Sequence, residues 1–243
     1  MTSYAVLPAI ATFCTLALTF LVLKDSVDRK AFLFGLCNLA IIFWNISDLF
    51  IALIPQHSTT IWVYRISNVA GIALPVLLVR FVHCLTGTDL DLNSIANKMR
   101  WRPRAIKILD IAAVLGAILC LTPLVIADLQ YKPFSEIRGT AYPFVAAVYI
   151  FGFLLAFIDL VQGLARCRKG SHERKQLIHF LIALIVGLIA VCIYLTGNLK
   201  LAPIYFSLEV LYVLLIAHIV KRHKFLNVQL FPYRYIAFIP CLL

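Results

Sequence analysis

The chain has 243 residues, of which 63% are hydrophobic and 14% are charged, and its mean hydropathy is +0.96. A soluble domain of this length needs a polar surface that this composition does not provide, so it indicates an integral membrane protein. The net charge of +11 does not indicate nucleic-acid binding, because the basic residues lie in short segments between apolar runs.

Seven runs are long and apolar enough to span a hydrocarbon layer, which takes about 20 helical residues. The predicted fold is therefore an all-α, polytopic membrane protein, a bundle of seven transmembrane helices. The bundle is expected to occupy residues 1–224, and residues 225–243 to form a truncated linker toward a cytoplasmic output domain that the chain lacks. The predicted helices lie near 4–23, 31–53, 60–85, 106–127, 141–165, 177–196 and 201–220.

The distribution of basic residues predicts the orientation of the bundle. Seventeen of the 22 Lys and Arg residues lie in loops or the tail on one side, and three lie on the other. Because basic loops stay in the cytoplasm, the N-terminus is predicted outside and the C-terminus inside the inner (plasma) membrane. The loops predicted outside are too short to fold as a ligand-binding domain: 54–59, 128–140 and 197–200.

The second and third predicted helices carry opposite charges at matching depth. Asp48 lies about five residues before the end of one helix, and Arg65 about five residues after the start of the next, so both lie roughly 7 Å inside the apolar layer. An unpaired charge in a bilayer costs about 2.5–3.5 kcal/mol on insertion scales. We therefore predict an Asp48–Arg65 ion pair.

Further polar residues on these two helices are predicted to face the inside of the bundle. Asn45 shares a helix face with Asp48, and Asn68 lies one turn after Arg65. Pro75 removes a backbone donor within the third helix and is predicted to kink it. Such a kink either makes room for a cavity or serves helix packing alone.

Glu209 lies near the middle of the last predicted helix, with Tyr205 and Tyr212 on the same face. This pattern fits either a protonated, hydrogen-bonded acid with a structural role, or an acid that lines a pocket or a proton path. Glu209 is the best single candidate for contact with a polar ligand. Nearer the inner side, Arg80 and Asp159 either pair across the bundle or Arg80 extends to the lipid headgroups.

We expect no catalytic site, no metal and no cofactor. The sequence has no Gly-rich phosphate loop and no GxSxG or HExxH motif. Its membrane histidines, His83, His179 and His218, lie on three different helices, and no lysine lies deep in the last helix, which excludes retinal attachment. The seven cysteines are interpreted as small buried hydrophobic residues, although Cys167 is also a candidate for acylation.

Several short motifs lie at characteristic places along these helices. The first group comprises Trp44, Asp48, Trp62 followed by Arg65, Gly71 followed by Pro75, and Phe81 before Thr86-Gly87. The second comprises Tyr142-Pro143, Ala202-Pro203 and the exit segment AHIVKRHKFLNVQLF. With these motifs, most of residues 31–230 resembles the seven-helix N-terminal region of bacterial sensor histidine kinases.

The resemblance implies a receptor that senses a signal within the membrane and passes helix movement to a kinase or cyclase. After Lys224 the sequence has no phosphoacceptor-histidine helix and no nucleotide-binding motif. We therefore expect a non-enzymatic sensor that is truncated or acts through a separate partner. The expected partners are the lipid bilayer, an unknown small or amphiphilic ligand, a kinase or cyclase module in cis (missing here) or in trans and, as one option, a second copy of the chain.

The predicted ligand pocket lies in the outer half of the bundle, between the second, third and seventh helices. Asp48 and Arg65 are expected to fix its geometry. The main alternative is a small-molecule or proton-coupled transporter; an intramembrane metalloenzyme and a scaffold with purely structural polar residues are the others. The predicted ligand-binding residues are Asn45, Asp48, Arg65, Asn68, Tyr205, Glu209 and Tyr212.

Overall fold

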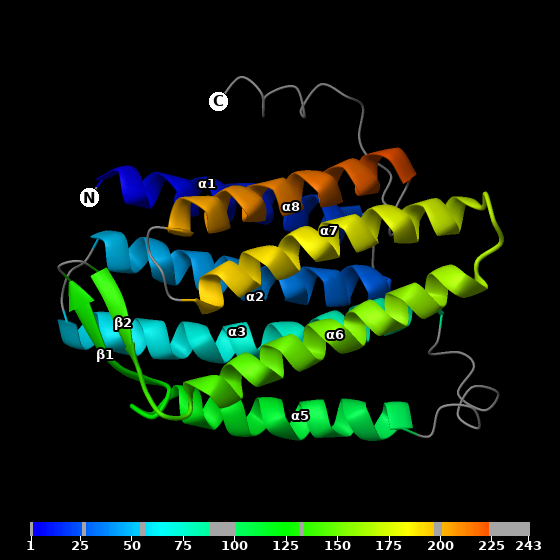
Figure 1. Ribbon diagram of the computed structural model, residues 1–243. Helices are drawn as coiled ribbons and strands as arrows, with labels where there is room; N and C mark the ends of the chain where they lie inside the picture. Colours follow the sequence, from blue (N-terminus) through cyan, green and yellow to red (C-terminus); the bar gives the residue numbers. More distant parts are fainter. Residues whose placement is uncertain are drawn as a thin grey trace.

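The computed structural model describes residues 2–25, 28–53, 57–87, 101–131, 134–196 and 201–223. Within these residues the chain forms seven α-helices that run side by side and one two-stranded β-hairpin (Figure 1). We call the end of the bundle that holds the N-terminus and the hairpin the hairpin end, and the other the far end. The elements are α1 (Thr2–Asp25), α2 (Arg29–Leu53), α3 (His57–Leu85), α5 (Trp101–Cys120), β1 (Ile126–Tyr131), β2 (Phe134–Arg138), α6 (Tyr142–Arg166), α7 (His172–Leu195) and α8 (Ala202–His223).

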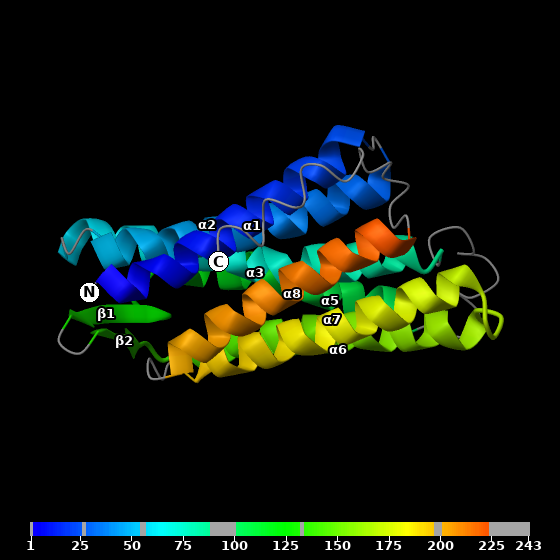
Figure 2. The ribbon, with the colours of Figure 1, turned by 90° about the horizontal axis from the view of Figure 1, so that it is seen from above.

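Six of the helices form a closed ring. Contacts join α1 to α2, α2 to α3, α3 to α6, α6 to α7, α7 to α8, and α8 back to α1. Helix α5 lies outside this ring, against α3 and α6. From above, α1 and α2 lie on one side of the bundle and α6 and α7 on the other (Figure 2). The ring therefore encloses an interior to which several helices contribute side chains.

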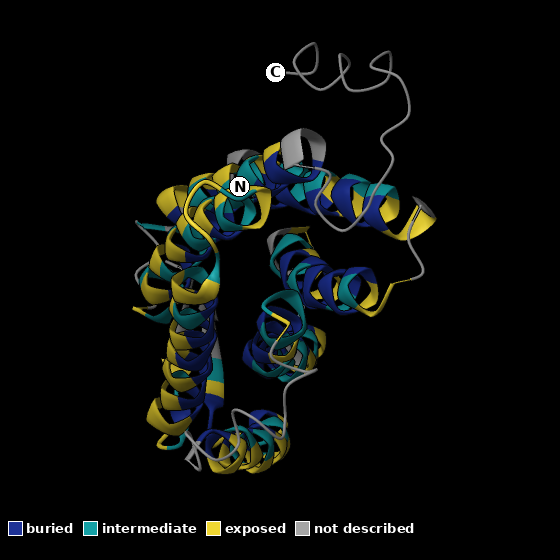
Figure 3. Ribbon diagram, turned by 90° about the vertical axis from the view of Figure 1, so that its right-hand side faces the viewer, coloured by how far each residue is buried: buried dark blue, intermediate teal, exposed yellow. Residues whose placement is uncertain are grey.

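The same six ring helices are long and apolar enough to cross a membrane. Helix α5 is not among these candidate spans, because Arg104, Lys107 and Asp110 interrupt its apolar sequence. Viewed along the bundle, exposed residues lie mainly on the outer surface and buried residues toward the interior (Figure 3). The exposed surface carries large apolar side chains suited to contact with lipid, among them Phe13, Phe43, Leu154, Ile182 and Leu214.

The fourth predicted helix, 106–127, is displaced toward the N-terminus. Helix α5 begins at Trp101 and ends at Cys120, where the Thr122 hydroxyl donates to the Leu119 carbonyl at 2.7 Å and Pro123 stops the helix. The chain then forms β1, which pairs antiparallel with β2. The segment predicted as an outer loop thus contains most of a hairpin, and the all-α prediction needs this addition.

The other helices match their predicted positions to within a few residues, and local chemistry explains the main difference. Helix α7 begins at His172 rather than near residue 177, because Ser171 caps it: the Arg174 amide donates to the Ser171 hydroxyl at 3.2 Å. Gly170, with φ of +84°, adopts the left-handed conformation that closes the turn after α6. The first residues of α7 are polar, so the apolar run on which the prediction rested begins only near residue 177.

Close packing of α3 against α6 explains why small residues recur along their interface. A Cβ atom on Gly71 would overlap the Tyr149 hydroxyl, and one on Gly152 would overlap the Pro75 ring. Pro75 lies inside the continuous helix α3, so its ring meets the neighbouring helix directly. The Gly71–Pro75 motif therefore positions α6 beside α3; the predicted kink at Pro75 stays a prediction.

Candidate functional site

A cavity with a volume of about 60 Å³ lies inside the ring of helices. Five of the six ring helices contribute to its lining: α2, α3, α6, α7 and α8. Most of the lining side chains are aliphatic or aromatic, and Glu209 is the charged residue among them. The lining residues are Cys37, Ile41, Trp44, Leu74, Leu78, Phe153, Leu184, Gly187, Ala190, Val191, Tyr205, Glu209 and Tyr212.

Glu209 is buried in the wall of this cavity, with 6% of its surface exposed. The Asn45 side-chain amide donates a hydrogen bond to Glu209 Oε1, and the Tyr205 hydroxyl faces the same carboxylate. The other carboxylate oxygen, Oε2, is buried and has no hydrogen-bond partner, and neither has Asn45 Oδ1. The pair thus leaves two acceptor oxygens without a hydrogen bond, both enclosed by protein atoms in or behind the wall of the cavity.

Aromatic side chains connect the helices around this site. The rings of Trp44 and Tyr194 meet edge to face, with centroids 4.4 Å apart, and the centroids of Tyr194 and Tyr205 are 5.4 Å apart. The hydroxyl of Tyr194 also lies 2.7 Å from that of Tyr64. These contacts join α2, α3, α7 and α8, so a displacement of one wall of the cavity reaches the others through packed side chains.

Four of the predicted ligand-binding residues lie together at this site. Tyr205, Glu209 and Tyr212 line the cavity, and Asn45 contacts it through its hydrogen bond to Glu209. Asp48 is partly buried one turn further along α2. The structure brings these residues together but contains no ligand, so their role in binding stays a prediction.

Arg65 and Asn68 lie elsewhere, and the predicted ion pair between Arg65 and Asp48 is wrong within the described residues. A terminal nitrogen of Arg65 donates instead to the Ile126 carbonyl oxygen at 3.0 Å, and its guanidinium lies 5.4 Å from the Trp62 ring centroid. The unpredicted hairpin supplies this carbonyl. Asn68 donates to the carbonyl of its own helix one turn earlier. Helix α3 therefore lines the cavity with leucines, not with its polar residues.

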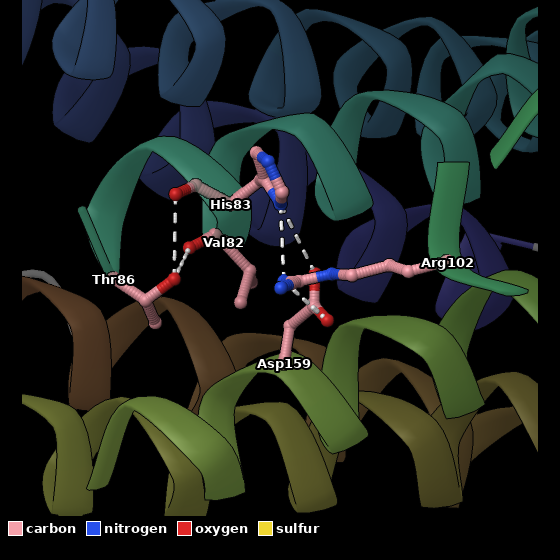
Figure 4. Close-up of polar contacts among 5 residues, drawn as sticks. All are labelled: Val82, His83, Thr86, Arg102 and Asp159. Carbon is pink, nitrogen blue, oxygen red and sulfur yellow. Dashed lines mark hydrogen bonds and ion pairs between the residues drawn. The ribbon is translucent and has the colours of Figure 1, made fainter. Parts of the chain in front are cut away.

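A second polar cluster, here called the ion cluster, joins α3, α5 and α6 toward the far end of the bundle (Figure 4). Arg102 donates to Asp159 Oδ1 at 2.6 Å, and His83 Nδ1 lies 3.4 Å from Asp159 Oδ2 and 3.1 Å from the Arg102 nitrogen. Arg102 and Asp159 expose 6% and 4% of their surfaces. This is a buried, charge-assisted network rather than a surface ion pair.

The ion cluster corrects the expectations for Arg80 and Asp159. Arg80 pairs with both Asp110 oxygens at 3.1 Å on the exposed surface, while Asp159 pairs with Arg102. The fourth predicted helix, near 106–127, left Arg102 outside it. The signal that sequence analysis missed is Pro103, which is favourable in the first turn of a helix and marks the start of α5.

The apolar ring helices, with their lipid-facing surface and a few buried polar side chains inside, define a multi-pass membrane protein with a cavity between its helices. The family model described as the N-terminal 7TM region of histidine kinase matches residues 7–229, and the chain belongs to this family. The match includes α1 from residue 7 onward, all the other described helices and the hairpin, and it confirms the resemblance drawn from the sequence motifs. No curated protein and no solved structure shows a significant match.

Proposed function

We propose that the chain is a membrane-embedded receptor module whose cavity holds a ligand and whose helices repack when the ligand binds. The observation that carries this proposal is Glu209, a buried carboxylate with an unused oxygen beside a cavity that five ring helices line. Membership of a histidine-kinase 7TM family supports a sensory role.

The energetics of the site favour a functional interpretation over a structural one. A buried polar atom without a hydrogen bond costs about 1–3 kcal/mol. An ionisable residue inside a membrane bundle is rare for the same reason, and it is commonly retained where it contacts a ligand or an ion. Glu209 would gain in stability from any bound group that donates to Oε2.

The proposed module has its hairpin end outside the cell and its far end in the cytoplasm, in the plasma membrane. The excess of Lys and Arg in the segments at the far end supports this orientation. Helix α8 lines the cavity with Tyr205, Glu209 and Tyr212 and ends at the far end. A rotation or shift of α8 is thus the proposed output, read by a kinase or cyclase module in cis or in trans.

Filling the cavity tests the proposal without a known ligand. A Cβ atom on Gly187 would lie 3.6 Å from the Tyr212 ring, an ordinary contact distance, so Gly187→Leu adds volume to the cavity without a backbone clash. With a reporter kinase fused after α8, we expect this variant to shift the basal reporter activity. Ala147→Leu adds similar volume on the exposed face of α6 and is the control. Equal activity of both variants and the parent would contradict a switching role for the cavity.

The position of Glu209 beside the cavity also favours a second candidate, a proton-coupled transporter in which this carboxyl group carries the proton. Uptake of a solute into vesicles by the purified chain, abolished by Glu209→Gln, would establish that function. Normal reporter signalling by the same variant would then count against the receptor.

A further inference from the structure

Resting on the proposed function, we propose a chemical class for the ligand: a primary ammonium group attached to a short apolar body of about three carbon atoms. The unpartnered hydrogen-bond acceptors of the site, its charge, the chemistry of the cavity wall and the volume of the cavity each restrict which ligand fits.

The unused hydrogen-bonding capacity at the site consists of acceptors. Glu209 Oε2 and Asn45 Oδ1 are both buried and unpartnered, and they belong to two side chains that are already hydrogen-bonded to each other. A carboxylate offers only acceptors, and an amide oxygen is likewise an acceptor. A ligand that fits must therefore donate, and an ammonium group brings three N–H donors on one atom.

The charge of the site favours a cation over a neutral donor. Among the described residues that line the cavity there is no Lys, Arg or His, so the lining offers no counter-charge to Glu209. Arg65, the nearest candidate expected from the sequence, is engaged by the Ile126 carbonyl instead.

The walls of the cavity suit an organic cation better than a metal ion. Trp44, Tyr205 and Tyr212 line the cavity together with Glu209, and aromatic rings attract ammonium groups. Leucine side chains from α3 and α7 complete an apolar space for a hydrocarbon body. A small metal cation would need a shell of several oxygen ligands, whereas most of this lining is carbon.

The volume of the cavity sets the size of the ligand. By the measure in which one water-sized group occupies about 10–15 Å³, the volume of about 60 Å³ holds roughly four to six non-hydrogen atoms, and the smallest of these sizes is chosen for the probe. Propylammonium has three carbons and one nitrogen and is the probe we choose. Its neutral counterpart is 1-propanol, which has the same length and also donates a hydrogen bond but carries no charge.

Trp44 provides a reporter within the cavity wall. The chain has three tryptophans, so Trp62→Phe and Trp101→Phe together leave Trp44 as the single tryptophan, which is excited selectively at wavelengths that tyrosine does not absorb. We propose to titrate this form, reconstituted in lipid nanodiscs, with propylammonium, 1-propanol and sodium ions. We expect saturable binding of propylammonium, about tenfold or more tighter than that of 1-propanol, and no competition by sodium.

Two further variants in the same background locate the interaction. Glu209→Gln should abolish the preference for the amine over the alcohol, and Gly187→Leu should abolish binding of both by filling the space. Because Gly187→Leu leaves the carboxylate untouched, it tests the site even where Glu209→Gln fails to fold.

The possible results separate the ligand class from the receptor itself. Equal affinity for amine and alcohol, saturation by sodium alone, or no binding of propylammonium would each overturn the proposed ammonium ligand. In any of these cases a shift of reporter activity in Gly187→Leu would leave the receptor proposal standing, whereas the absence of that shift would remove the receptor as well.

Discussion

Two buried carboxylates in this bundle have opposite surroundings. Asp159, toward the far end, is held by the Arg102 guanidinium at 2.6 Å with His83 beside it, and it does not line the cavity. Glu209 has the neutral amide of Asn45 and the Tyr205 hydroxyl at its carboxylate, and there is no cation among the described residues that line the cavity beside it. One carboxylate is neutralised within the chain, and the other is not.

This difference assigns different roles to the two sites. A buried ion pair fixes the positions of the helices that carry it, because removing either partner leaves an uncompensated charge inside the bundle. The ion cluster therefore acts as a link between α3, α5 and α6, in addition to the apolar packing of α5 against the ring. An unsatisfied acid beside a cavity gains from a bound partner, so the Glu209 site is the one suited to a signal.

The largest effect is expected from breaking the ion cluster. Asp159→Leu leaves the Arg102 guanidinium buried without its carboxylate, which should lower the free energy of unfolding by about 3–5 kcal/mol. Unfolding of the purified protein in mild detergent, followed by circular dichroism, measures the loss. Asp110→Leu is the matched control: it breaks the exposed pair with Arg80 and should cost less than about 1 kcal/mol. Equal losses in both variants would show that burial of the cluster contributes nothing.

Removing both charges sharpens the same test. In Arg102→Met combined with Asp159→Leu, no uncompensated charge remains, and apolar side chains of similar length fill the space. Replacement of a whole buried ion pair is often neutral or stabilising, so the double variant should recover to within about 1 kcal/mol of the parent. Additive losses in the double-mutant cycle would mean that the two residues act through other partners and not through each other.

A much smaller change is expected when the other carboxylate loses its charge. In Glu209→Gln the side-chain carbonyl still accepts from Asn45, while the neutral amide avoids burial of a charge without a counter-ion. The free energy of unfolding should therefore change by less than about 1 kcal/mol, in the stabilising direction. A loss as large as that of Asp159→Leu would make Glu209 a structural residue and remove the contrast between the two sites.

The part of the cavity that sequence analysis predicted depends on positions along single helices. The spacing of Tyr205, Glu209 and Tyr212 puts them on one face whatever the neighbours are, and apolar length alone located the ring helices. The predicted Arg65–Asp48 pair rested on the equal depth of the two residues on neighbouring helices. Depth alone does not fix how each helix is rotated about its own axis, and that rotation decides which residues face each other. Arg65 turns toward the hairpin, which is a non-local contact.

The parts that could not be predicted carry no distinctive residue types. Gly187 and Ala190 form the α7 wall of the cavity, but small apolar residues occur throughout these helices. Arg102 is buried because α5 packs against α3 and α6. In the sequence it is a basic residue just outside a predicted helix, and nothing at that position indicates burial. Both the α7 wall of the cavity and the burial of Arg102 depend on contacts between helices, and the periodicity of a single helix does not predict such contacts.

The smallest effect concerns Cys167, which lies with Asp159 toward the far end and reports which end of the bundle faces the cytoplasm. Burial, with a further contribution from Glu173, raises the pKa of the Cys167 thiol, so less thiolate is present at neutral pH than for a free cysteine. Labelling by a membrane-impermeant maleimide should be slow at neutral pH and should keep accelerating above pH 8.5, about the pKa of an unhindered thiol. With the orientation proposed above, this labelling occurs in inverted vesicles and not in intact cells, and Cys167→Ser removes it. Labelling in intact cells would instead place the ion cluster toward the outside and the Glu209 cavity toward the cytoplasm. An external ligand would then have to enter the ring from the far end.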